Sequence, residues 1–91
     1  MPTVLTVDDS RAVRTIVSKQ VRDLGFEVAE AEDGVQGLAK VAECQFDLVI
    51  LDVTMPNMDG PTLVRHVRRL RPDMAIIFMS GYAEEAFRKN D

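Results

Sequence analysis

The chain has 91 residues, of which 46% are hydrophobic and 29% charged, and its formal net charge at pH 7 is −4. These values are typical of one folded globular domain and exclude an intrinsically disordered chain. The acidic balance argues against general nucleic-acid binding, so no nucleic-acid partner is expected. A single cysteine, Cys44, rules out an internal disulfide and a cysteine-based zinc site, and we expect it only to pack.

No stretch of the sequence approaches the length of a membrane span. Residues 1–3 lead directly into a strand pattern, without the basic and apolar regions of a signal peptide. We therefore expect no membrane partner and a cytoplasmic location.

Residues 3–7 form an apolar run that predicts the first strand, and a helical pattern begins at Arg11. Ser10 is the expected N-cap of this helix, and Gly25 is the expected stop. The apolar residues that recur at helical spacing and are expected to face inward are Ala12, Val13, Ile16, Val17, Val21 and Leu24.

Residues 26–31 alternate between apolar and acidic side chains, which predicts a second strand near an edge of the sheet. A turn at Asp33 and Gly34 precedes a second helix over about 35–43. Its expected inner residues are Leu38, Val41 and Ala42. Residues 46–51 are apolar except for Asp47, which is typical of a central strand covered on both faces.

Residues 53–60 are rich in proline, asparagine and glycine and cannot continue a strand. Pro61 suits the first turn of a third helix, with Asp59 or Gly60 before it as the cap. The expected inner residues of this helix are Leu63, Val64, Val67 and Leu70. Residues 74–79 predict a fourth strand, and residues 83–89 look like the start of a fourth helix.

A basic patch lies on the predicted third helix and just after it. Such a run is most often a solvated face, and the alternative is a docking surface for an acidic partner. Its members are Arg65, His66, Arg68, Arg69 and Arg71.

Strict alternation of strands and helices predicts an α/β protein with a doubly wound parallel sheet and right-handed crossovers. If the second and third strands lie on opposite sides of the first, a crevice opens at the carboxyl ends of the first and third strands. Asp8 and Asp9 follow the first strand, and Asp52 follows the third. The fold rule and the positions of the acids therefore select the same place.

Three neighbouring carboxylates repel one another by about 1 to 4 kcal/mol per pair at a separation of about 4 Å, so the cluster needs a cation or a protonated member. Mg²⁺ fits, with Asp9 and Asp52 as direct ligands and Asp8 holding a coordinated water. Asp52 would also be a nucleophile for a phosphoryl group. Ser80 and the backbone at Thr54 are placed to provide further polar groups. For each acid taken alone, a helix cap or a loop start is the alternative.

Four segments in order along the chain resemble the receiver domain of two-component response regulators, a family that includes the single-domain bacterial chemotaxis regulator. The resemblance covers nearly the whole chain and implies a flavodoxin-like receiver fold with strand order 2-1-3-4. The segments are Val7–Ser10, Ala31–Gly34, Leu51–Gly60 and Met79–Ala83.

The resemblance implies a phosphoacceptor domain rather than an enzyme. Asp52 would accept a phosphoryl group from a phosphohistidine of a histidine kinase or phosphotransfer protein. The resemblance also implies Mg²⁺ at Asp8, Asp9, Asp52 and the backbone carbonyl of Thr54. Ser80 would be the switch hydroxyl.

The sequence departs from the family because the fifth strand, its terminal lysine and the fifth helix have no match, and Lys89 comes too early to replace that lysine. We therefore expect weak phosphorylation, little switching, and self-association through the edge of the fourth strand. The alternatives are a receiver-like interaction module without phosphorylation, or an engineered fragment or chimera. A haloacid-dehalogenase-type phosphatase would need a second acid where Thr54 stands.

Overall fold

A computed structural model describes residues 2–52 and 58–79. Over these residues, strands and helices alternate in strict order. The elements are β1 (Thr3–Val7), α1 (Arg11–Asp23), β2 (Glu27–Ala31), α2 (Gly34–Glu43), β3 (Leu48–Leu51), α3 (Gly60–Leu70) and β4 (Ala75–Phe78).

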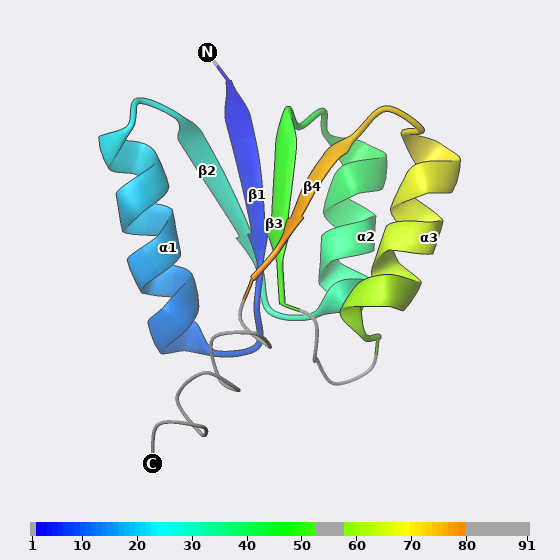
Figure 1. Cartoon of the computed structure of the whole chain (residues 1–91), viewed down its shortest axis with the longest axis horizontal. Helices are drawn as coiled ribbons and strands as arrows, with labels where there is room; N and C mark the ends of the chain where they lie inside the picture. The colour runs from blue at the N-terminus through cyan, green and yellow to red at the C-terminus, as the bar shows by residue number, and fades with distance from the viewer. Residues whose placement is uncertain (1, 53–57, 80–91) are drawn as a thin grey trace.

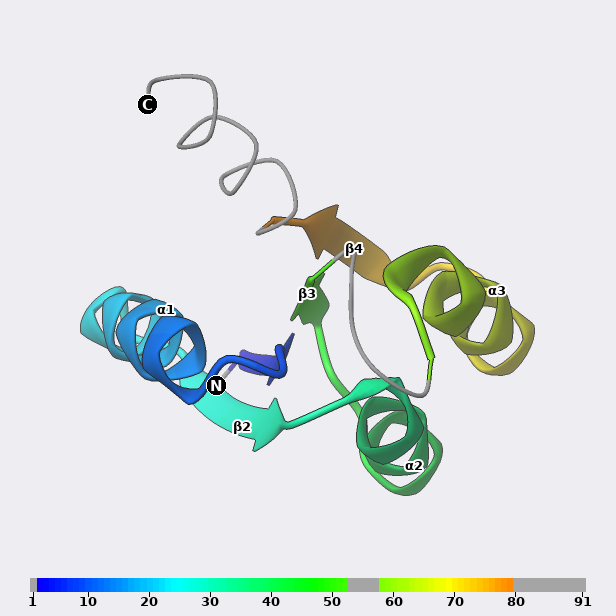
Figure 2. The same cartoon turned by 90° about the horizontal axis from the view of Figure 1, so that it is seen from below.

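The strands form one parallel sheet in the order β2-β1-β3-β4 (Figure 1). Helix α1 covers one face of the sheet, and α2 and α3 cover the other (Figure 2). The predicted doubly wound, flavodoxin-like arrangement with strand order 2-1-3-4 is therefore confirmed. Among the described residues, every helix falls short of the length and apolarity that a membrane crossing requires.

The main hydrophobic core lies between the sheet and helices α2 and α3. Strand register places Leu5, Val49 and Ile76 side by side, so alternate residues of three strands face the same helices. The buried members of this core are Leu5, Val7, Ala31, Val41, Val49, Leu51, Leu63, Val67 and Met74.

The inner face of α1 differs from the prediction. Ile16 and Leu24 are 57% and 75% exposed, whereas Arg14 and Ser18 are buried with Val21. Ser18 Oγ lies 3.1 Å from Thr6 Oγ1 in a buried hydrogen bond, so a polar pair takes a place that periodicity gave to apolar residues. Ala12 is exposed as well. The prediction that Ala12, Ile16 and Leu24 face inward is therefore wrong, because side chains that find internal hydrogen bonds can be buried in their place.

Helix ends agree closely with the sequence. The side chains of Ser10 and Asp59 accept backbone N–H bonds from Val13 and Thr62, at 3.3 Å and 2.8 Å, as N-caps do. Gly25 has a φ of 97°, the left-handed conformation that ends a helix at low steric cost.

Other expectations about packing need correction. Ala42 and Leu70 are exposed rather than inward, because they lie near the ends of their helices. Cys44 is also exposed, so its expected packing role is wrong. Strand β3 is interior to the sheet, but Leu48 and Ile50 are only half-buried because α1 does not cover that part of its face. The predicted helix over 83–89 lies outside the described residues.

The basic patch is largely solvated, as predicted. Arg65, Arg68 and Arg69 are exposed, while His66 and Arg71 are half-buried. The guanidinium of Arg68 donates to the carbonyls of Pro72 and Met74, so part of this charge fastens the turn between α3 and β4.

Candidate functional site

The three predicted acids meet at the carboxyl ends of β1 and β3. These strands pair in parallel with Val7 opposite Leu51, so the residues that follow them emerge side by side. The Asp52 N–H donates to the Val7 carbonyl at 3.0 Å and extends this pairing by one residue. Carboxylate oxygens of Asp8, Asp9 and Asp52 lie within 4.8 Å of one another.

Asp8 is the most constrained of the three acids, and it is only 2% exposed. Its Oδ1 accepts a hydrogen bond from the Ser10 N–H at 2.8 Å. Its Oδ2 is buried and has no hydrogen-bond partner among the described residues. An unsatisfied buried acceptor costs about 1 to 3 kcal/mol, and more when it is charged, so this oxygen is suited to a cation.

The electrostatics of the cluster also favour a cation. Burial raises the pKa of Asp8, and the charges of Asp52 and Asp9 raise it further. The Ser10 N–H bond and the Arg14 guanidinium act in the opposite direction. Asp52 is buried and Asp9 is exposed, so the cluster is open on one side. Oxygen ligands with one open side fit Mg²⁺, which retains several waters when it binds.

A family model for the response regulator receiver domain matches residues 4–90. The chain belongs to this family. Members are signalling domains, so this receiver domain is not expected to act as an enzyme in its own right.

Similar proteins and structures agree with this assignment. The chain is 47% identical over 90 residues to the sensor kinase CckA of Brucella abortus, covering 97% of this chain and 10% of that protein. The chemotaxis protein CheY4 of Vibrio cholerae has a similar structure, with a TM-score of 0.83 and 37% identity over 93% of this chain and 76% of the other. The response regulator TrrA of Thermotoga maritima, in complex with Mg²⁺-BeF, matches with a TM-score of 0.84 and 33% identity over 90% of this chain and 74% of the other.

Sequence reasoning missed the role of Gly60 in placing the end of β3. A Cβ atom at Gly60 would lie 2.7 Å from the Asp52 carbonyl oxygen and 2.9 Å from Leu51 Cδ1. The start of α3 therefore lies directly against the end of β3. The sequence signalled only a helix cap here, because close approach of backbone segments leaves no periodic pattern.

Sequence reasoning also missed Arg14, whose guanidinium lies beside the cluster. A signal was present, since Arg14, Ser18 and Val21 recur at helical spacing, but two of the three are polar. The remaining predicted site residues, Thr54 and Ser80, lie outside the described residues. Their roles stay predictions.

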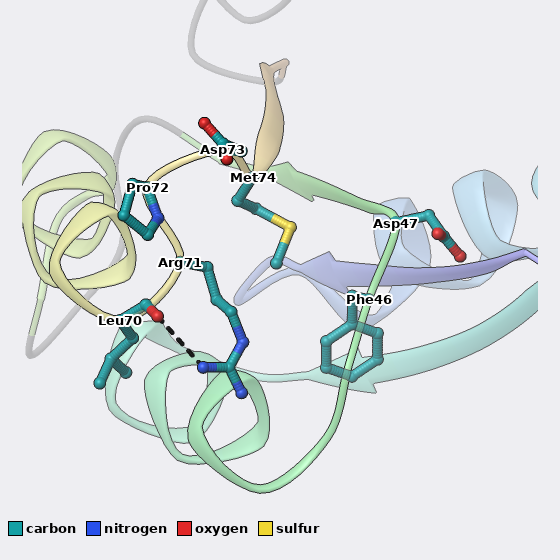
Figure 3. A pocket seen from close by; sticks show the side chains of 7 residues that line it. All are labelled: Phe46, Asp47, Leu70, Arg71, Pro72, Asp73 and Met74. Carbon is teal, nitrogen blue, oxygen red and sulfur yellow. Dashed lines mark hydrogen bonds between the residues drawn. The ribbon is translucent and has the colours of Figure 1, made fainter.

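A separate pocket of about 380 Å³ lies at the other end of the sheet (Figure 3). Segments before β3 and β4 line it, including Phe46 and Met74, and Arg71 donates to the Leu70 carbonyl at its edge. The acids of the cluster follow the opposite ends of their strands. This pocket is therefore distinct from the metal-binding candidate.

Proposed function

We propose that this receiver domain accepts a phosphoryl group on Asp52 with Mg²⁺ bound at Asp8, Asp9 and Asp52. The donor would be the phosphohistidine of a histidine kinase or phosphotransfer protein. The observation that carries the proposal is the meeting of three carboxylates, one of which, Asp8, has a buried Oδ2 without a hydrogen-bond partner among the described residues. The Thr54 carbonyl as a ligand, the Ser80 hydroxyl as a switch and a cytoplasmic location belong to the same proposal.

In the transfer, an Asp52 carboxylate oxygen attacks phosphorus, the phosphorus–nitrogen bond breaks, and the donor histidine leaves with the bonding electron pair. Bound Mg²⁺ supplies positive charge that offsets the charge on the phosphoryl oxygens. Asp52 is held for this attack by its backbone bond to Val7. Asp8 and Asp9 would supply further carboxylate oxygens to the bound ion.

Incubation with acetyl phosphate and Mg²⁺, followed by mass spectrometry, tests the proposal. We expect one added phosphoryl group, located on Asp52 and absent when EDTA is present. Asp52→Asn should abolish the modification. Asp73→Asn, which removes the same charge from an exposed turn, should leave it unchanged.

Two results would contradict the proposal. No modification of the wild type would favour the interaction module without phosphorylation. Sustained release of phosphate from small phosphoesters would favour a phosphatase. The modified fraction of the wild type also measures whether phosphorylation is weak, as the sequence predicts.

We also propose that a second copy of the chain pairs with the edge of β4. Among the described residues, β4 pairs only with β3, and its Ile77 and Phe78 are 49% and 45% exposed. The opposite edge strand, β2, carries Glu27 and Glu30, and acidic residues of this kind oppose edge pairing. A β4 edge is complementary to a second β4 edge by two-fold symmetry. Light scattering that shows a monomer at all concentrations would contradict this pairing.

A further inference from the structure

Arg14 lies on the inner face of α1, where the sequence pattern had not predicted a charged residue. It is only 9% exposed. Its Nε donates to Glu30 Oε1 at 2.9 Å, and its Nη1 donates to the backbone carbonyl of Asp8 at 2.8 Å. Because guanidinium donors have a fixed planar geometry, two such bonds define the position of the group.

The polar groups of Asp8 are held from three directions. Its N–H donates to the Ala31 carbonyl at 3.1 Å, and its Oδ1 accepts from the Ser10 N–H. Its carbonyl oxygen accepts from Arg14. Only Oδ2 has no partner among the described residues, and it is buried. Rotation of the Asp8 side chain would therefore break the bond from Ser10, and a shift of its backbone would break the bond to Ala31 or the bond from Arg14.

We propose that Arg14 is a positioning residue for the metal pocket. It fixes the backbone of Asp8 against the end of β2, through Glu30, so that Oδ2 stays directed at the cation position. Arg14 does not touch the metal. This inference rests on the proposed function, because it assigns Arg14 to the same magnesium site.

A positioning role of Arg14 and a purely electrostatic role predict opposite effects on Mg²⁺ binding when Arg14 is removed. A guanidinium near a divalent cation repels it, and Glu30 offsets part of that charge. If Arg14 acted only through its charge, its loss would strengthen Mg²⁺ binding. If Arg14 acts by holding Asp8, its loss weakens binding.

The variants Arg14→Gln and Arg14→Lys separate these effects, because the second keeps the charge but cannot keep both bonds. We expect both to weaken Mg²⁺ affinity about tenfold, the lower end of the effects seen when groups that hydrogen-bond to metal ligands are removed. Arg22→Gln is the matched control, since Arg22 lies on the same helix, approaches Glu30 at 3.7 Å and, among the described residues, forms no hydrogen bond with Asp8. Its affinity should stay within about twofold of the wild type.

Calorimetric titration with MgCl₂ measures the affinity. Hydrogen exchange of the Ser10 amide in the metal-free protein gives a second readout, because this amide bonds to Asp8 Oδ1. Exchange should accelerate in both Arg14 variants and stay unchanged in Arg22→Gln. Circular dichroism checks that each variant is folded. If an Arg14 variant unfolds, Glu30→Gln is used in its place, because this change keeps the bond from Arg14 to Asp8. Its readout is the Ser10 amide, which should exchange faster than in the wild type, because loss of the Glu30 charge would weaken Mg²⁺ binding under either role of Arg14.

The outcomes distinguish this inference from the proposed function. If the wild type binds Mg²⁺ but Arg14→Gln binds it equally well or more tightly, the positioning role is overturned and the proposed function stands. If the Ser10 amide exchanges at the wild-type rate in the Arg14 variants, the positioning role is likewise overturned. If the wild type binds no Mg²⁺, the proposed function fails and the inference fails with it.

Discussion

Strands β3 and β4 have similar apolar sequences and lie side by side, but their surroundings differ. Val49 and Leu51 of β3 are fully buried, whereas Ile77 and Phe78 of β4 remain about half exposed. Strand β3 is paired on both edges, and β4 has a partner on one edge among the described residues. Position in the sheet, rather than composition, therefore decides which apolar run is buried.

This difference also separates two roles. The buried strand ends in Asp52, whose backbone is fixed by its pairing with β1. Among the described residues, β4 has no strand partner on its outer edge and carries exposed apolar side chains, which suit a partner rather than a reaction. The proposed chemistry therefore lies at the centre of the sheet, and the proposed association lies at its edge.

Alanine substitutions at two residues that face each other across β3 and β4 should show the largest difference in the free energy of unfolding. Leu51 and Phe78 lie opposite each other in neighbouring strands. Leu51→Ala removes a fully buried side chain and should lower the free energy of unfolding by about 2 to 5 kcal/mol. Phe78→Ala should lower it by less, because much of that ring is already in water. Urea denaturation measures both, and equal losses would contradict the contrast.

Gly60→Ala should have the next largest effect, because the new methyl group would overlap the Asp52 carbonyl. Overpacking of this kind costs about 1 to 3 kcal/mol of unfolding free energy. The proposed phosphorylation of Asp52 should fall as well, because the backbone that carries Asp52 must shift. Arg65→Ala, at an exposed position of the same helix, is the control and should change neither quantity. An unchanged Gly60→Ala protein would show that α3 can move away freely.

Asp8→Asn should stabilise the metal-free protein at neutral pH, and the change should be smaller than the losses expected for Leu51→Ala and Gly60→Ala. The pKa of Asp8 is raised in the folded state, first by burial, so folding favours the protonated form. Its contribution to stability is complete below the unfolded pKa, near 3.8, and is lost as pH rises through the folded pKa. The amide stays neutral, so the variant should lose this part of the pH dependence.

Thermal denaturation across pH, without metal, measures the effect of Asp8→Asn. Asp73→Asn is the control, because it removes an equal charge from an exposed turn. Mg²⁺ should stabilise the wild type and leave Asp8→Asn almost unchanged. A variant less stable than the wild type at neutral pH would contradict the view that burial disfavours the charged form of Asp8.

The helix caps followed from local patterns in the sequence, and the meeting of the three acids followed from the rules of parallel sheets once the strand order was given. The resemblance to receiver domains implied that order, 2-1-3-4. The sequence did not predict Arg14 and Ser18 on the inner face of α1, since their burial depends on partners in β1 and β2 that lie elsewhere in the sequence. Exposure of Ile16 was missed for a related reason. Periodicity identifies an apolar stripe, but it does not show how much of the sheet the helix covers.

Ile77→Lys is expected to have the smallest effect on folding and tests the open edge directly. The side chain is already half exposed, so the free energy of unfolding should change by no more than about 0.5 kcal/mol. A lysine on an edge strand opposes pairing with another sheet, so self-association should weaken. Val35→Lys is the control, because Val35 is similarly exposed but lies on α2, away from the edge. Light scattering at matched concentrations should show dissociation for Ile77→Lys alone. Equal association of both variants would mean that copies of the chain meet through another surface.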